Sequence, residues 1–198
     1  MNVRSILVAV LALLAGCATS QLLEQKSNPD YVGKSFKSVM VVAVANDEII
    51  RRTYEDRVVA LLGKRGTKGI PAYAAVGGRG QVEEADLRQA IARSGAEGVM
   101  ITRVTRVDRS SGHISGSTVA VGVGFYGYYS TVWQTVNVPP KNVTGATWTL
   151  SETRLFDARN GALAWTGVVE TRENDDLGSA LTQYIDLVFD AMVRDRVL

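Results

Sequence analysis

An uninterrupted apolar run from Val39 to Ala45, rich in β-branched residues, constrains the fold of this 198-residue chain more than any other feature. Such a run is typical of a strand covered on both faces, because a strand with one face in water alternates apolar and polar residues. Helices must then lie on both sides of the sheet that contains it. The sequence therefore predicts an α/β domain, with α+β character, in which this segment is a central strand.

A capped helix is predicted directly after this strand. The side chains of Asn46 and Asp47 can accept hydrogen bonds from the first free amides of a helix. Apolar residues then recur at spacings of four and three up to about Leu62, which is the helical period. The charged residues between them are expected to face solvent: Arg51, Glu55 and Asp56.

The alternation of strands and helices continues to residue 107. A second, weaker strand is expected over 70–76, and a third over 99–107. Between them an acidic first turn at 83–86 opens a helix that Gly95 ends as a C-cap. The order β-α-β-α-β predicts adjacent parallel strands with helical crossovers.

The second half of the chain is rich in strand patterns. Strand-like segments cover 117–123, 130–138, 144–156 and 162–171. The dipeptide Asn160-Gly161 between the last two is a strong hairpin signal. An apolar stripe from about Asp175 predicts a C-terminal helix that docks on the sheet. We therefore expect one mixed sheet in a single domain spanning residues 36–198.

The amino end has the pattern of an export signal. Arg4 precedes ten apolar residues, 6–15, which are about half of the roughly 20 that a membrane-spanning helix needs. Residues 14–17, Leu-Ala-Gly-Cys, resemble the lipobox of bacterial lipoproteins. That resemblance implies removal of residues 1–16, a diacylglycerol on the sulfur of Cys17 and a further acyl chain on its amino group. Several acyl chains hold a protein firmly on a membrane.

The residues after Cys17 refine this location. Ala18 stands where an Asp would mark retention in the inner membrane of two-membrane bacteria, so the resemblance implies the periplasmic face of the outer membrane. Residues 18–35 are polar and show little periodicity. We expect residues 17–35 to consist of the lipidated Cys and a flexible tether.

Composition restricts the classes of partner. Only Arg4 of the 22 basic residues precedes Cys17, so 21 basic residues face 20 acidic ones in the mature chain, and this balance gives no argument for nucleic acid. Cys17 is the only cysteine and His113 the only histidine, which cannot form a closed zinc site. We predict no disulfide, no metal site and no cofactor.

The candidates for catalysis are weak. Residues 122–127 have the Gly-x-Gly-x-x-Gly spacing of a dinucleotide loop, but the β-prone residues that follow predict no helix to hold a phosphate. His113 has serines nearby and no nucleophile elbow, and a surface loop histidine is the simpler interpretation. We therefore assign no catalytic residue.

The most unusual segment is uncharged, from Ile114 to Pro140, and contains glycines and clustered aromatic residues. We expect a hairpin over 112–135 there. Aromatic residues are enriched at binding hot spots, yet aromatics in a hairpin also pack on their own domain, and both alternatives stay open. The candidate partner-binding residues are Phe125, Tyr126, Tyr128, Tyr129 and Trp133.

Two segments add a family resemblance. Residues 94–101, Ser-Gly-Ala-Glu-Gly-Val-Met-Ile, lead from helix to strand, and residues 155–165, Leu-Phe-Asp-Ala-Arg-Asn-Gly-Ala-Leu-Ala-Trp, form a strand-turn-strand pattern. Together with the lipobox they resemble envelope lipoproteins that include relatives of the curli secretion protein CsgG, the penicillin-binding-protein activator LpoB and uncharacterised lipoproteins of that fold. The chain lacks an obvious pair of long transmembrane hairpins like those of the secretion channels.

The resemblance implies a non-enzymatic function. Those folds serve as binding and scaffold modules, so the expected partner is another envelope component, either a protein or peptidoglycan. Two alternatives remain open: a homo-oligomeric structural subunit of an envelope assembly, and a periplasmic hydrolase. A cleft that contains a perturbed carboxylate, or His113 beside a serine, would favour the hydrolase.

Overall fold

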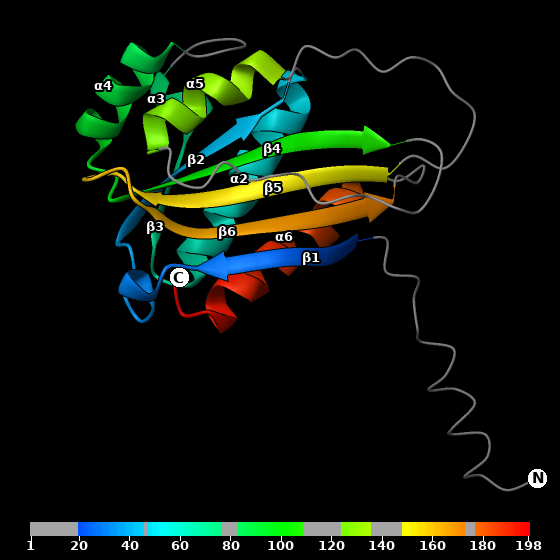
Figure 1. The fold of residues 1–198 in the computed structure, drawn as a ribbon. Helices are drawn as coiled ribbons and strands as arrows, with labels where there is room; N and C mark the ends of the chain where they lie inside the picture. The colour runs from blue at the N-terminus through cyan, green and yellow to red at the C-terminus, as the bar shows by residue number, and fades with distance from the viewer. Residues whose placement is uncertain (1–19, 46, 77–82, 109–123, 136–147, 173–176) are drawn as a thin grey trace, which may run out of the picture.

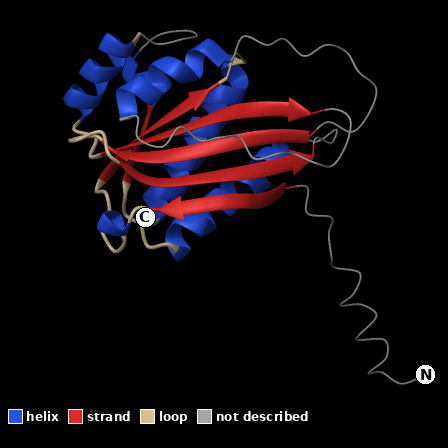
Figure 2. Cartoon of the chain, in the orientation of Figure 1, coloured by secondary structure: helices blue, strands red, loops and turns tan. Residues whose placement is uncertain are grey.

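The computed structural model describes residues 20–45, 47–76, 83–108, 124–135, 148–172 and 177–198. These residues form one six-stranded mixed sheet in the order β1-β6-β5-β4-β2-β3. Helices lie on both of its faces (Figures 1 and 2), which confirms the predicted α/β class. The strands are β1 (Ser20–Ser27), β2 (Ser38–Val44), β3 (Lys68–Pro71), β4 (Gly98–Asp108), β5 (Trp148–Asp157) and β6 (Leu163–Arg172).

The parallel half of the sheet follows the prediction. Strand β2 pairs in parallel with β3 on one side and with β4 on the other, and all seven of its residues are buried. Helix α2 (Glu48–Lys64) begins where Asp47 accepts hydrogen bonds from two amides. Helix α4 (Glu84–Ser94) ends at Gly95, which has a φ of 67°. Residues 72–76, predicted as strand, instead form the short helix α3 (Ala72–Val76).

The antiparallel half contains β5, β6 and β1. Strands β4 and β5 are antiparallel, and β5 and β6 form the predicted hairpin, in whose turn Gly161 has a φ of 71°. Helix α6 (Leu177–Arg194) lies against β1 and β6, as expected for the C-terminal helix. Trp165 of β6 is fully buried beneath it, and Gly167 leaves room for the indole ring.

The helices divide into two layers. Helices α2 and α6 form a core with one face of the sheet, while α3, α4 and α5 (Phe125–Thr135) form a second core with the other face. In the first core, hydroxyl groups form a buried chain across the sheet: Tyr54 with Thr102 at 2.6 Å, Thr102 with Thr153 at 2.6 Å, and Thr153 with Tyr184 at 2.5 Å. This chain connects α2 to α6 through the middle strands.

The predicted tether is wrong for residues 20–27. They form β1, an edge strand that pairs with β6 from Ser20 opposite Thr171 to Ser27 opposite Trp165. A 3-10 turn, η1 (Pro29–Tyr31), follows, and Tyr31 is buried. The folded domain therefore includes residues 20–35, which the sequence had assigned to the tether.

The predicted hairpin over 112–135 is also wrong where the structure describes it. Residues 125–135 form helix α5, and residues 109–123 lie outside the described part of the chain. The helix buries Phe125, Tyr128, Tyr129 and Val132, which recur at the helical spacing. Tertiary packing of this stripe outweighs the β propensity of the individual residues.

Candidate functional site

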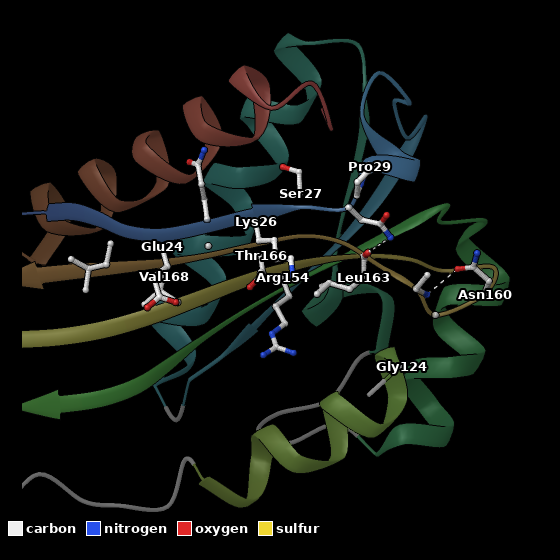
Figure 3. A pocket seen from close by; sticks show the side chains of 16 residues that line it. Glu24, Lys26, Ser27, Pro29, Gly124, Arg154, Asn160, Leu163, Thr166 and Val168 are labelled. Carbon is white, nitrogen blue, oxygen red and sulfur yellow. Dashed lines mark hydrogen bonds between the residues drawn. The ribbon is translucent and has the colours of Figure 1, made fainter. Parts of the chain in front are cut away.

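A groove runs along the half of the sheet that no described helix covers on one face (Figure 3). It measures about 960 Å³, which is near the upper end of the usual range for ligand sites. We name it the β1–β6 groove. Its lining residues come from β1, β6, β5, the turns beside these strands and the residue before α5: Leu23, Glu24, Gln25, Lys26, Ser27, Asn28, Pro29, Gly124, Arg154, Asn160, Gly161, Ala162, Leu163, Thr166, Gly167 and Val168.

A buried charge cluster lies where this groove meets α5. The Glu152 carboxylate, 1% exposed, accepts hydrogen bonds from Arg154 Nε at 2.7 Å and from Arg103 Nε at 3.0 Å. The Tyr128 hydroxyl donates to the same carboxylate at 2.7 Å. Two guanidinium groups therefore share one carboxylate, and the cluster has a net positive charge of one.

Tyr128 and the two arginines stabilise one another in this cluster. The guanidinium carbon of Arg154 lies 4.1 Å from the centre of the Tyr128 ring, within the range of a cation–π contact. Burial raises the pKa of the Tyr128 phenol, and the Glu152 charge raises it further, so the phenol stays protonated and donates. Burial lowers the pKa of Arg103, but Tyr128 and Glu152 outweigh this effect and raise it.

One polar atom of the groove has no partner among the described residues. The hydroxyl oxygen of Thr166, on β6, is buried and makes no hydrogen bond there. A buried hydroxyl without a hydrogen bond costs about 1–3 kcal/mol. Rotation of the side chain about Cα–Cβ would turn the hydroxyl into the groove, where a bound polar group would remove that cost. Lys26 and Glu24 extend from β1 on the same side (Figure 3).

The aromatic residues proposed from sequence lie outside this groove. Phe125, Tyr128 and Tyr129 are at most 5% exposed and belong to the domain's own core, where Phe125 and Tyr128 pack against Phe156. Tyr126 is half-buried beneath the Arg88 guanidinium of α4. Packing on the domain itself, the alternative to a partner surface, is what the structure shows for the three buried rings. The side chain of Trp133 lies outside the described part of the chain.

The argument against a dinucleotide-binding loop at residues 122–127 was that no helix follows the glycines, and helix α5 contradicts it. A helix does follow Gly124, although the sequence pattern predicted none. Its first amide, that of Phe125, donates to the Gly161 carbonyl at 3.1 Å. The amino end of this helix is thus packed against the β5–β6 turn. Residues 122 and 123 of the Gly-rich pattern lie outside the described residues.

The carboxylates with shifted pKa values lie away from the groove. Glu55, predicted to face solvent, is 1% exposed, and its oxygens accept from the amides of Ala43 at 3.0 Å and Tyr73 at 2.9 Å. Burial raises its pKa to about 6. Arg51, predicted exposed as well, is 3% exposed. Both are buried because β2 and the start of α3 close over that side of α2.

Asp157 is the second such carboxylate, at the end of β5. Hydrogen bonds from Arg159 lower its pKa, and it also accepts from the Tyr31 hydroxyl at 3.2 Å. Its contacts fix the β5–β6 turn and the 3-10 turn after β1. Both Glu55 and Asp157 therefore stabilise the fold at the places where elements join.

Several sequence candidates fall outside the described residues: Cys17, His113 and the strand-like segment 117–123. Within the described ranges, no three side chains of His, Cys, Asp or Glu gather into a group that could hold a metal ion. Among the described helices, none combines the length and the apolar character needed to cross a membrane.

The groove residues were missed because their signals are weak in sequence. Glu152 and Arg154 stand two apart on a strand, which places opposite charges on one face of the sheet. That spacing alone could have predicted an ion pair between these two side chains. The roles of Lys26 and Thr166 depend on β1, and no pattern in residues 20–27 predicts that this strand joins the sheet.

Comparisons with known proteins name no family for this chain. No family model matches it, and no curated protein sequence matches it. Solved structures similar to it include the PelC dodecamer from Paraburkholderia phytofirmans, at 14% identity over 86% of this chain and 95% of that one, with a TM-score of 0.47. Lipoprotein GNA1162 from Neisseria meningitidis is 17% identical over 79% of this chain and 98% of that one, with a TM-score of 0.43.

A third similar structure is protein XCC0632 from Xanthomonas campestris, described with the family model DUF330. It is 12% identical over 84% of this chain and 86% of that one, with a TM-score of 0.37. At TM-scores below 0.5 these likenesses carry no argument about the function of this chain. None of the three is CsgG or LpoB, so that finer resemblance stays a prediction.

Proposed function

We propose that this chain is a lipid-anchored, non-enzymatic binding module of the bacterial envelope and that the β1–β6 groove is its binding site. The observation that carries the proposal is the unpaired, buried Thr166 hydroxyl in a groove of about 960 Å³. In this proposal, acyl chains on Cys17 anchor the chain at the periplasmic face of the outer membrane. The partner that binds in the groove is an envelope protein or peptidoglycan.

The contacts of the buried acids support a binding function over hydrolysis. Glu55 and Asp157 are held by backbone amides, Arg159 and Tyr31, at junctions of the fold. Glu152, which adjoins the groove, is already engaged by two guanidinium groups and a phenol. An acid or base for hydrolysis needs access to substrate, and these three carboxylates face the protein.

A homo-oligomeric subunit is the second candidate, and the edge strand favours it. In the described part of the chain, no strand pairs with the outer edge of β1. Two copies of β1 paired antiparallel about Gln25 would place Glu24 opposite Lys26 twice, and opposite charges on facing strand positions attract. Sedimentation of the domain without lipid at micromolar concentration tests this candidate.

The variant Thr166→Val tests the groove. Valine has the shape of threonine without the hydroxyl, so we expect the domain to gain about 1 kcal/mol of stability. If the hydroxyl serves a partner, the same variant loses binding while it gains stability. A photo-crosslinker at Lys26, which lines the groove, should then capture a discrete partner in cells, and Thr166→Val should reduce that capture several-fold.

A crosslinker at Ile49 provides the control. Ile49 is 77% exposed and lies on α2, away from the groove. Capture of the same partner from both positions, or capture from Lys26 that Thr166→Val leaves unchanged, would contradict the groove assignment. Crosslinks only between copies of the chain would favour the oligomer.

A further inference from the structure

We infer that the end of the sheet at which β1 begins lies directly against the lipid surface, so that the domain stands on the membrane in a fixed orientation. The inference rests on the proposed lipidation of Cys17. We name this end the anchor end: β1 starts there at Ser20, β6 ends there at Arg172, and β5 starts there at Trp148. It is the right-hand end of the sheet in Figure 1.

The covalent reach of the chain carries the inference. Only Ala18 and Thr19 separate Cys17 from Ser20. Consecutive Cα atoms are 3.8 Å apart, so three steps span at most about 11 Å in any conformation. The polar layer of a bilayer is itself about 5–8 Å thick on each side. An acylated Cys17 therefore brings the Cα of Ser20 to the headgroups.

Ser20 is fixed to the folded domain and does not extend this reach. It is 7% exposed, its backbone pairs opposite Thr171, and the hydroxyl groups of the two residues are 3.0 Å apart in a buried hydrogen bond. Fraying of β1 would break this contact and expose both hydroxyls. A residue that is fixed in the sheet thus lies within three residues of the proposed lipid attachment.

In this orientation one end of the β1–β6 groove lies at the membrane surface and the other end lies away from it. Strand β1 runs away from the anchor end for eight residues, which is about 24 Å. The turn that contains Gly161 and the carboxyl terminus lie at the opposite end, where the Gly33 amide donates to the Arg196 carbonyl at 2.7 Å. A partner in the β1–β6 groove would therefore lie beside the membrane surface and extend away from it.

Förster energy transfer from a donor on the protein to an acceptor in the membrane measures this orientation. The acylated sulfur of Cys17 does not react with a thiol label, so one added cysteine is labelled selectively. Gln21→Cys places a donor at the anchor end, and Asp30→Cys places one at the opposite end; both residues are exposed. The full acylated protein is reconstituted in vesicles of phosphatidylethanolamine and phosphatidylglycerol with a headgroup-labelled acceptor. We expect transfer at position 21 to exceed that at position 30 at least threefold.

A spacer variant tests whether the short link between Cys17 and Ser20 is what holds the domain in this orientation. Insertion of 20 Gly and Ser residues between Ala18 and Thr19 should lower transfer at position 21 at least twofold, because the link no longer holds the domain. Equal transfer at positions 21 and 30 in the native-length protein would overturn the inference, and so would a spacer that changes nothing. Absence of acyl label on Cys17, checked against Cys17→Ala, would overturn the proposed anchoring and this inference together, whereas equal transfer in acylated protein overturns the inference alone.

Discussion

The two halves of the sheet differ in how completely they are covered. Strands β2, β3 and β4 lie between helices on both faces, and every residue of β2 is buried. Strands β6 and β1 pack against α6 on one face, while their other face lines the groove. The covered half contains the contacts that stabilise this fold, and the open half, formed by β6 and β1, contains the groove that we propose as the binding site.

Within β6 the covered face should dominate stability. Trp165→Ala removes a fully buried indole and its hydrogen bond to Asp195, 2.9 Å long, and should lower the free energy of unfolding by about 3–5 kcal/mol. Urea denaturation measures this loss. Val104→Ala, at a residue 46% exposed on β4, is the control and should change stability by less than about 0.5 kcal/mol. Similar losses of unfolding free energy for both variants would contradict the conclusion that the covered face of β6 dominates stability.

The charge cluster at the boundary of the two halves comes next. Glu152→Gln leaves two guanidinium groups near Tyr128 without their carboxylate, and removal of one partner from a buried ion pair should cost about 3 kcal/mol. The double variant Glu152→Gln with Arg154→Met should recover part of that loss, because the charge left uncompensated is also removed. Additive losses in thermal or urea unfolding would show that the three side chains do not act as one cluster.

The covered half holds a carboxylate whose protonation should couple to stability. The pKa of Glu55 is about 6 in the folded chain against 4.5 when exposed. The folded state therefore binds more protons between these values, and stability should fall by about 2 kcal/mol in total as pH rises from about one unit below 4.5 to about one unit above 6. Unfolding measured against pH in the parent and in Glu55→Gln checks this. A slope that survives in the variant would assign the effect to another group.

Adjacent residues of β6 give the smallest and most direct test of the two faces. Val169 belongs to the core with α6, whereas Val168 lines the groove. Val169→Ala should cost roughly 2 kcal/mol, while Val168→Ala, at a residue that is 6% exposed and belongs to neither helix-covered core, should cost roughly 1 kcal/mol. Equal costs in urea unfolding would indicate that the groove face is packed as tightly as the core.

Local signals predicted the covered half well. The apolar run of β2, the Asp47 cap of α2 and the Gly95 end of α4 each act within a few residues, and each is found where expected. The Asn160-Gly161 turn, an equally local signal, was predicted correctly in the other half. For these elements the determining contacts are close in sequence. Two predictions inside this half are wrong. Residues 72–76 form helix α3 and not a strand, and Arg51 and Glu55 are buried because β2 and α3 close over them.

The open half resisted prediction because its order depends on distant partners. Strand β1 is polar and mostly exposed, so nothing in residues 20–27 distinguishes it from a linker. Its pairing with β6 decides its structure. Helix α5 was misassigned for another reason: Phe125, Tyr129 and Val132 do have helical spacing, but the aromatic and β-branched composition suggested strands. The candidate site could not be located without β1 in place.

The pairing of β1 with β6 also sets the order in which the chain can fold. Ser20 and Thr171 are 151 positions apart, so the first strand of the domain has no partner until almost all the rest exists. Contacts between such distant residues form late, because a long loop must close first. A chain synthesised from its amino end therefore leaves β1 without its partner strand until β6 has formed. Among the described strands, β1 is therefore synthesised first and paired last.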